Sequence, residues 1–176
     1  MISLPIVNTG ITFTEIPDNI AYFMEIGNCT QKCKGCHSPH LQGDTVEPTL
    51  LKDIINDCIK AKQQGATAIL LLGGTTNGIP INTFNLIIKE LSFLLPVGVY
   101  SGAPVDSDCH KYLIDNSMLK WLKVGDYDSA KGGLDKPTTN QRFYERDDRW
   151  EVIVDSNYLI EDIHYKWHDI THKFWK

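Results

Sequence analysis

The sequence contains no long apolar run and no cluster of basic residues. Its apolar stretches, such as residues 68–72, are far shorter than the roughly 20 residues that cross a bilayer, and residues 1–7 carry no basic region ahead of an apolar core. The 17 Lys and Arg residues are dispersed and are outnumbered by 22 Asp and Glu residues, giving a net charge of -5. Nucleic-acid-binding proteins usually concentrate positive charge. We therefore expect a cytoplasmic protein that binds neither membranes nor nucleic acids.

The chain is too short for two domains of ordinary size. Its 176 residues, 42% of them apolar, suffice for one domain with a substantial core. We expect a single domain over residues 1–176, with its core at about 20–145 and an aromatic C-terminal tail at 150–176. Cys58 and Cys109 belong to no close-set cysteine motif, so ordinary reduced thiols are expected there.

The other three of the five cysteines lie within residues 28–40. Cys29, Cys33 and Cys36 are spaced C-x3-C-x2-C, directly after an apolar run at residues 21–26. An odd number of close thiols argues against disulfides and favours a metal centre. Zinc would need a fourth ligand, which His37 or His40 could supply. An iron–sulfur cube normally takes four cysteines, so three would leave one iron open for chemistry. Both options remain at this point.

Apolar runs and amphipathic segments alternate along the chain. The pattern predicts strands at 21–26, 66–72, 97–100 and 119–124, and helices at 48–65, 81–95 and 106–116. Residues 6–16 are β-branched and end at Pro17, which indicates an edge strand or an entry arm. Such alternation predicts a mainly parallel sheet whose ligands gather at the carboxyl ends of its strands. The cysteine loop, Gly73-Gly74 and Ser101-Gly102 all follow predicted strands.

The cysteine motif resembles the signature of radical S-adenosylmethionine (SAM) enzymes. The form Cys-Lys-Gly-Cys-His is similar to that of the activating proteins of anaerobic ribonucleoside-triphosphate reductases, as is the Gly-rich loop at 123–144 that finishes in Asn140-Gln141-Arg142. The resemblance covers residues 20–145. It implies a compact partial (β/α) barrel of radical SAM type, in which Cys29, Cys33 and Cys36 hold a 4Fe-4S cluster whose open iron chelates SAM.

The same resemblance implies an oxidoreductase activity. The reduced cluster would cleave SAM, and the resulting radical would place a glycyl radical on an anaerobic ribonucleoside-triphosphate reductase. A flavodoxin-like or ferredoxin-like protein would supply the electron. No acid–base pair is expected, because the chemistry belongs to the cofactors. The alternatives are activation of another glycyl radical enzyme of the formate-lyase type, a zinc or iron–sulfur binding module, and an electron-transfer protein without SAM chemistry.

The expected SAM contacts come from three loops. In the family, a Gly-Gly-Glu or Gly-Gly-Asp motif follows the second strand, and this chain has Gly73, Gly74 and Thr75 there. The missing acid puts a side-chain contact to the SAM amine in doubt, whereas backbone approach needs only the missing Cβ atoms. Without the resemblance, the glycines would indicate a flexible turn. The expected cofactor-binding residues are Gly35, Cys36, His37, Gly73, Gly74 and Ser101.

Two features of the C-terminal part have ambiguous patterns. Arg142 has three candidate roles, which are contact with the cofactor carboxylate, contact with the partner, and hydrogen bonding to carbonyls of its own loop. In the tail, apolar spacings of three and four favour a helix, although Ile163, Tyr165 and Trp167 alternate as in a strand. The helical interpretation rests on Leu159, Ile163, Trp167, Ile170 and Phe174. His164, His168 and His172 recur every fourth residue, and no ligand role is assigned to them.

Overall fold

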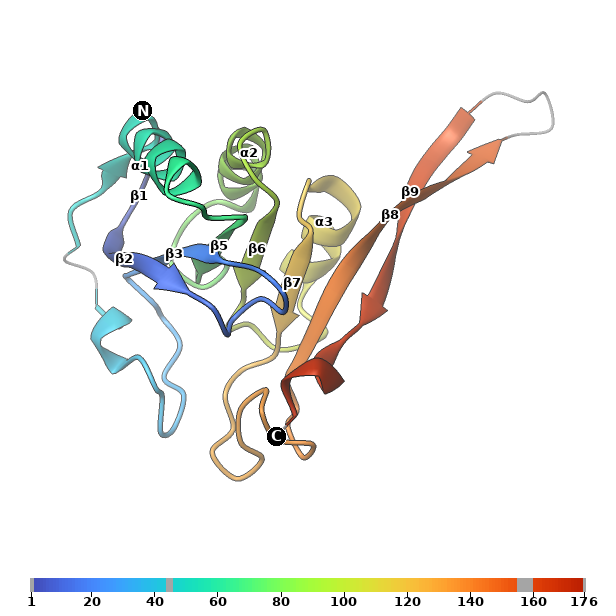
Figure 1. Cartoon of the computed structure of the whole chain (residues 1–176). Helices are drawn as coiled ribbons and strands as arrows, with labels where there is room; N and C mark the ends of the chain where they lie inside the picture. The colour runs from blue at the N-terminus through green and yellow to red at the C-terminus, as the bar shows by residue number, and fades with distance from the viewer. Residues whose placement is uncertain (1, 44–45, 155–159, 176) are drawn as a thin grey trace.

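A seven-stranded mixed sheet organises the molecule (Figure 1). The computed structural model describes residues 2–43, 46–154 and 160–175. Strand order across the sheet is β2-β3-β5-β6-β7-β8-β9. The strands are β2 (Ile6–Thr12), β3 (Ala21–Ile26), β5 (Ala68–Leu72), β6 (Val97–Tyr100), β7 (Trp121–Val124), β8 (Arg142–Val154) and β9 (Ile160–Asp169). A separate two-stranded ladder joins β1 (Ser3–Leu4) to β4 (Thr49–Leu50).

The centre of the sheet is parallel and its flanks are antiparallel. Strands β3, β5, β6 and β7 pair in parallel, whereas β2, β8 and β9 pair antiparallel with their neighbours. The prediction of alternating strands and helices is confirmed for β3 to β7. The sheet as a whole is mixed, however, so the expected mainly parallel arrangement holds only for these four central strands. The connecting helices are α1 (Leu51–Gln63), α2 (Ile81–Ser92) and α3 (Asp108–Asn116). Within the described ranges, no helix is long and apolar enough to cross a membrane.

Side chains from the two faces of the sheet form two apolar clusters. The larger cluster joins strand residues such as Met24, Leu71 and Val99 to helical residues such as Ile54 and Phe84. The smaller one, on the opposite face, contains Leu70, Trp121 and Phe143 together with Ile16 and Ile170. Alternate residues of β5 enter different clusters, as the period of two in a strand requires. The uniformly apolar sequence of β5 is therefore explained by burial on both faces.

The C-terminal tail is a strand, so the helical interpretation was wrong. Residues of β9 pair antiparallel with β8, and the resulting hairpin projects from the sheet edge (Figure 1). The sequence of the tail fits both a helical and a strand-like spacing of apolar residues, and pairing with β8 selects the strand. Strand β8 itself was not expected, because its Glu-Arg-Asp-Asp-Arg stretch hides any apolar alternation. Leu159 lies outside the described residues. Beyond β9, the 3₁₀ helix η2 (Thr171–Phe174) packs Phe174 against Phe143.

Gly74, which follows β5, makes room for the core. Its φ is 107°, a backbone conformation that L side chains rarely adopt, and a Cβ there would overlap the ring of Phe84. Phe84 on α2 is completely buried. The absence of a side chain at position 74 therefore lets helix α2 pack closely against the strand end, and Gly74 has a structural reason to be glycine.

We predict that Gly74→Ala lowers the free energy of unfolding by about 3 kcal/mol or more, because it adds overpacking to backbone strain. Chemical denaturation measures this loss. Gly43→Ala is a matched control, since its φ is also positive at 131° but an added Cβ would meet nothing within 4 Å. If both substitutions cost the same, backbone strain alone is responsible and the Phe84 contact contributes nothing.

Candidate functional site

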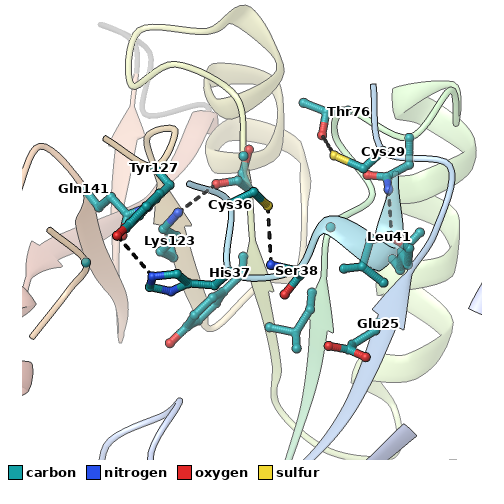
Figure 2. A pocket seen from close by; sticks show the side chains of 18 of the residues that line it. Glu25, Cys29, Cys36, His37, Ser38, Leu41, Thr76, Lys123, Tyr127 and Gln141 are labelled. Carbon is teal, nitrogen blue, oxygen red and sulfur yellow. Dashed lines mark hydrogen bonds between the residues drawn. The ribbon is translucent and has the colours of Figure 1, made fainter. Parts of the chain in front are cut away.

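A cavity of about 450 Å³ lies where the central parallel strands end (Figure 2). The loops after β3, β5, β6 and β7 meet there, as expected for the carboxyl edge of a parallel sheet. Of the sequence-predicted residues, Cys29, Cys36, His37, Gly73 and Ser101 line the cavity. Cys33 lines a neighbouring hollow together with Asp126 and Tyr127, so the cysteine loop divides the two spaces. The structure thus brings most of the predicted site residues together.

The cysteine loop is held by its backbone to the loop after β5. The Thr30 amide donates to Thr76 O at 2.9 Å, while the Cys29 amide closes the loop on itself by donating to Leu41 O at 2.9 Å. The loop leaves β3 through Asn28, whose φ is 60°, and turns again at Gly35, whose φ is 72°. Asparagine and glycine tolerate this left-handed region better than other residues. The local sequence, with Asn28 and Gly35 at the two turns, therefore favours the path by which the loop reaches the cavity.

The three thiols suit a metal centre in number and exposure. Cys29, Cys33 and Cys36 are all free and partly buried. The Ser38 amide donates to Cys36 Sγ at 3.4 Å, and Cys29 Sγ lies 3.8 Å from Thr76 Oγ1. Among the described residues, no three His, Cys, Asp or Glu side chains already form a metal-ligating group. The donor set still fits an iron–sulfur cluster, because one loop carries three thiols, and two of them, Cys29 and Cys36, border a cavity that could hold a further ligand.

Neither histidine of the loop is directed at the cysteines. His37 Nε2 lies 3.0 Å from the Tyr127 hydroxyl, with ring centroids 4.4 Å apart (Figure 2). His40 Nε2 lies 3.3 Å from Glu25 Oε2. Both interactions connect the cysteine loop to other parts of the chain. Cys58 is remote from this loop in helix α1, where burial raises the pKa of its thiol to about 12 and keeps it protonated.

Lys123 is a charged residue at the cavity that the sequence analysis did not select. Only 8% of the residue is exposed, and its Nζ donates to Gly125 O at 2.7 Å and to Ser101 O at 3.3 Å. Burial lowers the pKa of Lys123 to about 8. Because an ammonium has three donors, two carbonyl contacts leave one N–H for an anionic ligand. A lysine in a predicted strand was the only sequence signal for this role.

Asn77 fastens the glycine turn to the end of β3. Its Oδ1 accepts the Gly74 amide at 2.7 Å, while Nδ2 donates to Ile26 O at 2.9 Å and to Gly27 O at 2.7 Å. The residue is 5% exposed. Gly73 lines the cavity, whereas Gly74 is buried under Phe84. Asn77 therefore fixes the spacing between the cysteine loop and Gly73.

Ser101 belongs to a hydrogen-bonded group behind the cavity wall. Its Oγ lies 2.7 Å from Thr75 Oγ1 and 2.6 Å from His110 Nε2, and it accepts the Ala103 amide at 3.1 Å. His110 Nδ1 lies 3.0 Å from Val105 O. Burial lowers the pKa of His110, although the hydrogen bond to Val105 O opposes this. His110 is a second residue that the sequence analysis missed, because helix α3 carries no motif.

The Gly-rich loop between β7 and β8 is folded by its own hydrogen bonds. Asn140 Nδ2 donates to Asp126 O at 3.1 Å, and Thr138 Oγ1 donates to Lys131 O at 2.7 Å. Arg142 donates to the carbonyls of Thr139 and Gln141 at 2.9 and 2.8 Å, with Asp169 at 3.6 Å. Of the three candidate roles of Arg142, the structure shows the one that holds its own loop.

We predict that Asn77→Asp destabilises the fold by about 3 kcal/mol, because a carboxylate would face the carbonyls of Ile26 and Gly27 and remove both donors. Thermal or chemical unfolding measures this change. The control is Asn116→Asp, which makes the same amide-to-carboxylate change at an exposed position, the end of α3. An equal and small effect at both positions would contradict the role given to Asn77.

Comparisons with known proteins found no similar protein. No family model matches the sequence, and neither the curated proteins nor the solved structures give a significant match.

Proposed function

We propose that this protein is a radical SAM activase that generates a glycyl radical on an anaerobic ribonucleotide reductase. The observation that carries the proposal is one loop with three free cysteines at the edge of the sheet where four parallel strands end, with Cys29 and Cys36 lining the cavity there and Cys33 a neighbouring hollow. The resemblance of Cys-Lys-Gly-Cys-His to the reductase-activating family supports it. The parallel β3-β5-β6-β7 segment, with helices between its strands, is compatible with a partial barrel of radical SAM type.

In this proposal Cys29, Cys33 and Cys36 hold a 4Fe-4S cluster through their thiolates. When bound and reduced, the cluster would supply the electron that cleaves SAM to methionine and a 5'-deoxyadenosyl radical, and that radical would take a hydrogen atom from a glycine Cα. Thr76, near Cys29, and the Ser38 amide, which contacts Cys36, would stabilise the thiolates, since hydrogen bonds to sulfur tune such clusters. The partly buried positions of the cysteines also limit their contact with water.

The cavity has the size and lining for SAM. Its volume of about 450 Å³ lies within the usual range of roughly 300–1,000 Å³ for small-molecule sites. Backbone groups at Cys36, His37 and Gly73, which line the cavity, would lie against the cofactor, whereas Gly35 does not line it. Lys123 would pair its free N–H with the SAM carboxylate, an interaction strengthened by the low dielectric of its buried position. Gly74 would act indirectly, by setting the path of Gly73.

A protein substrate suits the openness of this edge. A second hollow of about 650 Å³ adjoins the cavity, and Glu15, His37 and Leu134 border both. The exposed Phe13 and Trp175 lie on that second hollow. Exposed aromatic side chains are favoured at protein interfaces. The reductase would present its glycine loop here, and a flavodoxin-like or ferredoxin-like protein would deliver the electron.

We predict that anaerobically reconstituted protein binds about four irons per chain, and that Cys29→Ala, Cys33→Ala and Cys36→Ala each abolish this binding. Iron analysis and visible absorption measure the outcome. Cys109→Ala is the matched control, because that thiol is also partly buried but lies in α3. Stoichiometric zinc with no iron after anaerobic purification would refute the cluster and support a zinc-binding module.

We predict that Lys123→Met weakens SAM binding by roughly ten- to a hundredfold while iron content stays unchanged, because one charge-assisted hydrogen bond is lost. Titration of the reconstituted protein with SAM measures the affinity, and its unfolding midpoint shows that the fold persists. Lys111→Met is the control, since this exposed lysine pairs with Asp108 on the surface of α3. Unchanged SAM affinity in Lys123→Met would remove Lys123 from the site.

A further inference from the structure

We propose that the hollow around Cys33 is the docking surface for an acidic one-electron donor protein, and that it is separate from the hollow that would admit the reductase. The inference rests on the proposed function, which requires a flavodoxin-like or ferredoxin-like donor. Its structural basis is the division of the three thiols between two spaces. Cys29 and Cys36 line the cavity, whereas Cys33 lines a hollow of about 430 Å³ of its own.

The hollow around Cys33 lies between the cysteine loop and the loop that joins β7 to β8. Residues 31–34 form one side of it, and residues 126–129, 131 and 140 form the other. Among the described residues, Tyr127 alone also lines the cavity, and none of the residues lining this hollow borders the one that holds Phe13 and Trp175. A donor docked here would therefore approach the cluster from the side of Cys33, without entering the space proposed for SAM.

Positive charge gathers at this hollow although the chain as a whole is acidic. Three lysines line it together with two aspartates, in a protein whose net charge is -5. Lys131 Nζ lies 3.4 Å from Asp128 Oδ2, whereas Lys32 and Lys34 form no ion pair with any residue that the structure describes. Both of these lysines are exposed, and they flank Cys33 in the sequence. Their ammonium groups therefore remain available to the carboxylates of a partner.

This distribution of charge favours an acidic partner at one place on the surface. Charges of like sign repel, so a protein of net negative charge disfavours contact with an acidic donor over most of its surface. The two lysines beside Cys33 reverse that interaction locally, and complementary charge mainly speeds and orients association. Electron transfer needs only a brief encounter that brings two redox centres close together. Interfaces of this kind are small, so a few lysines around one hollow suffice.

The transfer itself forms and breaks no bond of this chain. One electron passes from the donor, which is oxidised, to the cluster, which is reduced. Lys32 and Lys34 act on the donor by attraction and are docking residues. Their loss should therefore impair reduction by a protein donor and leave reduction by a small neutral molecule unchanged.

Binding of an oxidised flavodoxin, which cannot reduce the cluster, tests the surface without a measurement of activity. Lys32→Glu/Lys34→Glu should weaken this binding by roughly tenfold or more at low ionic strength, because two attractive charges become repulsive. The affinity of the wild-type protein should fall as salt is added, since exposed charges are screened. Lys89→Glu/Lys111→Glu is the matched control, because these exposed lysines lie on α2 and α3 and border neither hollow. Calorimetry measures the affinities in reconstituted and in iron-free protein.

Reduction of the reconstituted protein separates docking from damage to the cluster. Lys32→Glu/Lys34→Glu should keep its iron content and should be reduced by photoexcited 5-deazariboflavin at the wild-type rate, since this small neutral molecule needs no docking surface. Its reduction by reduced flavodoxin should slow by roughly tenfold or more. Lys32→Gln/Lys34→Gln should show a smaller loss, because the charges are removed but not reversed.

Equal flavodoxin affinity in Lys32→Glu/Lys34→Glu and in the wild-type protein would overturn the docking surface. Loss of that affinity in Phe13→Ala/Trp175→Ala, which alters the other hollow, would do the same, as would slower reduction of the lysine variant by 5-deazariboflavin. If SAM is cleaved with 5-deazariboflavin but flavodoxin binding ignores the lysines, the proposed function survives and this inference fails. If the wild-type protein takes up no iron, the proposed function fails, and flavodoxin binding to the iron-free protein still decides the surface.

Discussion

The site depends on one buried side chain that joins two strand ends. Asn77 uses its carboxamide to accept the Gly74 amide and to donate to the carbonyls of Ile26 and Gly27. Those carbonyls end β3 and precede the cysteine loop, while Gly74 belongs to the turn after β5. The amide therefore satisfies backbone groups that a strand end would otherwise leave buried and unpaired. It also sets how far the cysteines lie from Gly73, and so fixes the width of the cavity at this side.

The sequence predicted the central fold because its apolar runs were unambiguous. The runs that became β3, β5, β6 and β7 are short, rich in apolar residues and separated by amphipathic helices, so their type and order followed directly. The conformation of the C-terminal part, β8 and β9, was not predicted. In β8, charged residues interrupt the alternation, and in β9 the spacing of apolar residues fits two periods. The pairing of β8 with β7 and with β9, which the apolar pattern of neither segment reveals, decides their conformation.

The candidate site was predicted in part for a similar reason. Cysteine spacing and paired glycines are local patterns, so Cys29, Cys36 and Gly73 were found from the sequence, and the structure places them around one cavity. Asn77 acts through contacts with residues 51 and 50 positions away, whereas Lys123 and His110 bond to nearer strand-end residues, and no sequence motif marks any of the three. Gly74 shows the opposite case. The paired glycines suggested that the cofactor approaches the backbone there, whereas the packing of Phe84 explains why this residue is glycine.

The contact between His37 and Tyr127 bears on the order in which parts of the site form while the chain is synthesised. These residues are 90 positions apart, and Tyr127 lies on the loop that leads from β7 into β8. The smaller apolar cluster, which holds the other face of the sheet, needs Ile170 near the C-terminus. In a growing chain, the cysteine loop would therefore be made well before the Tyr127 that contacts it. The long sequence separation also places this contact late in folding, since distant contacts form after local ones.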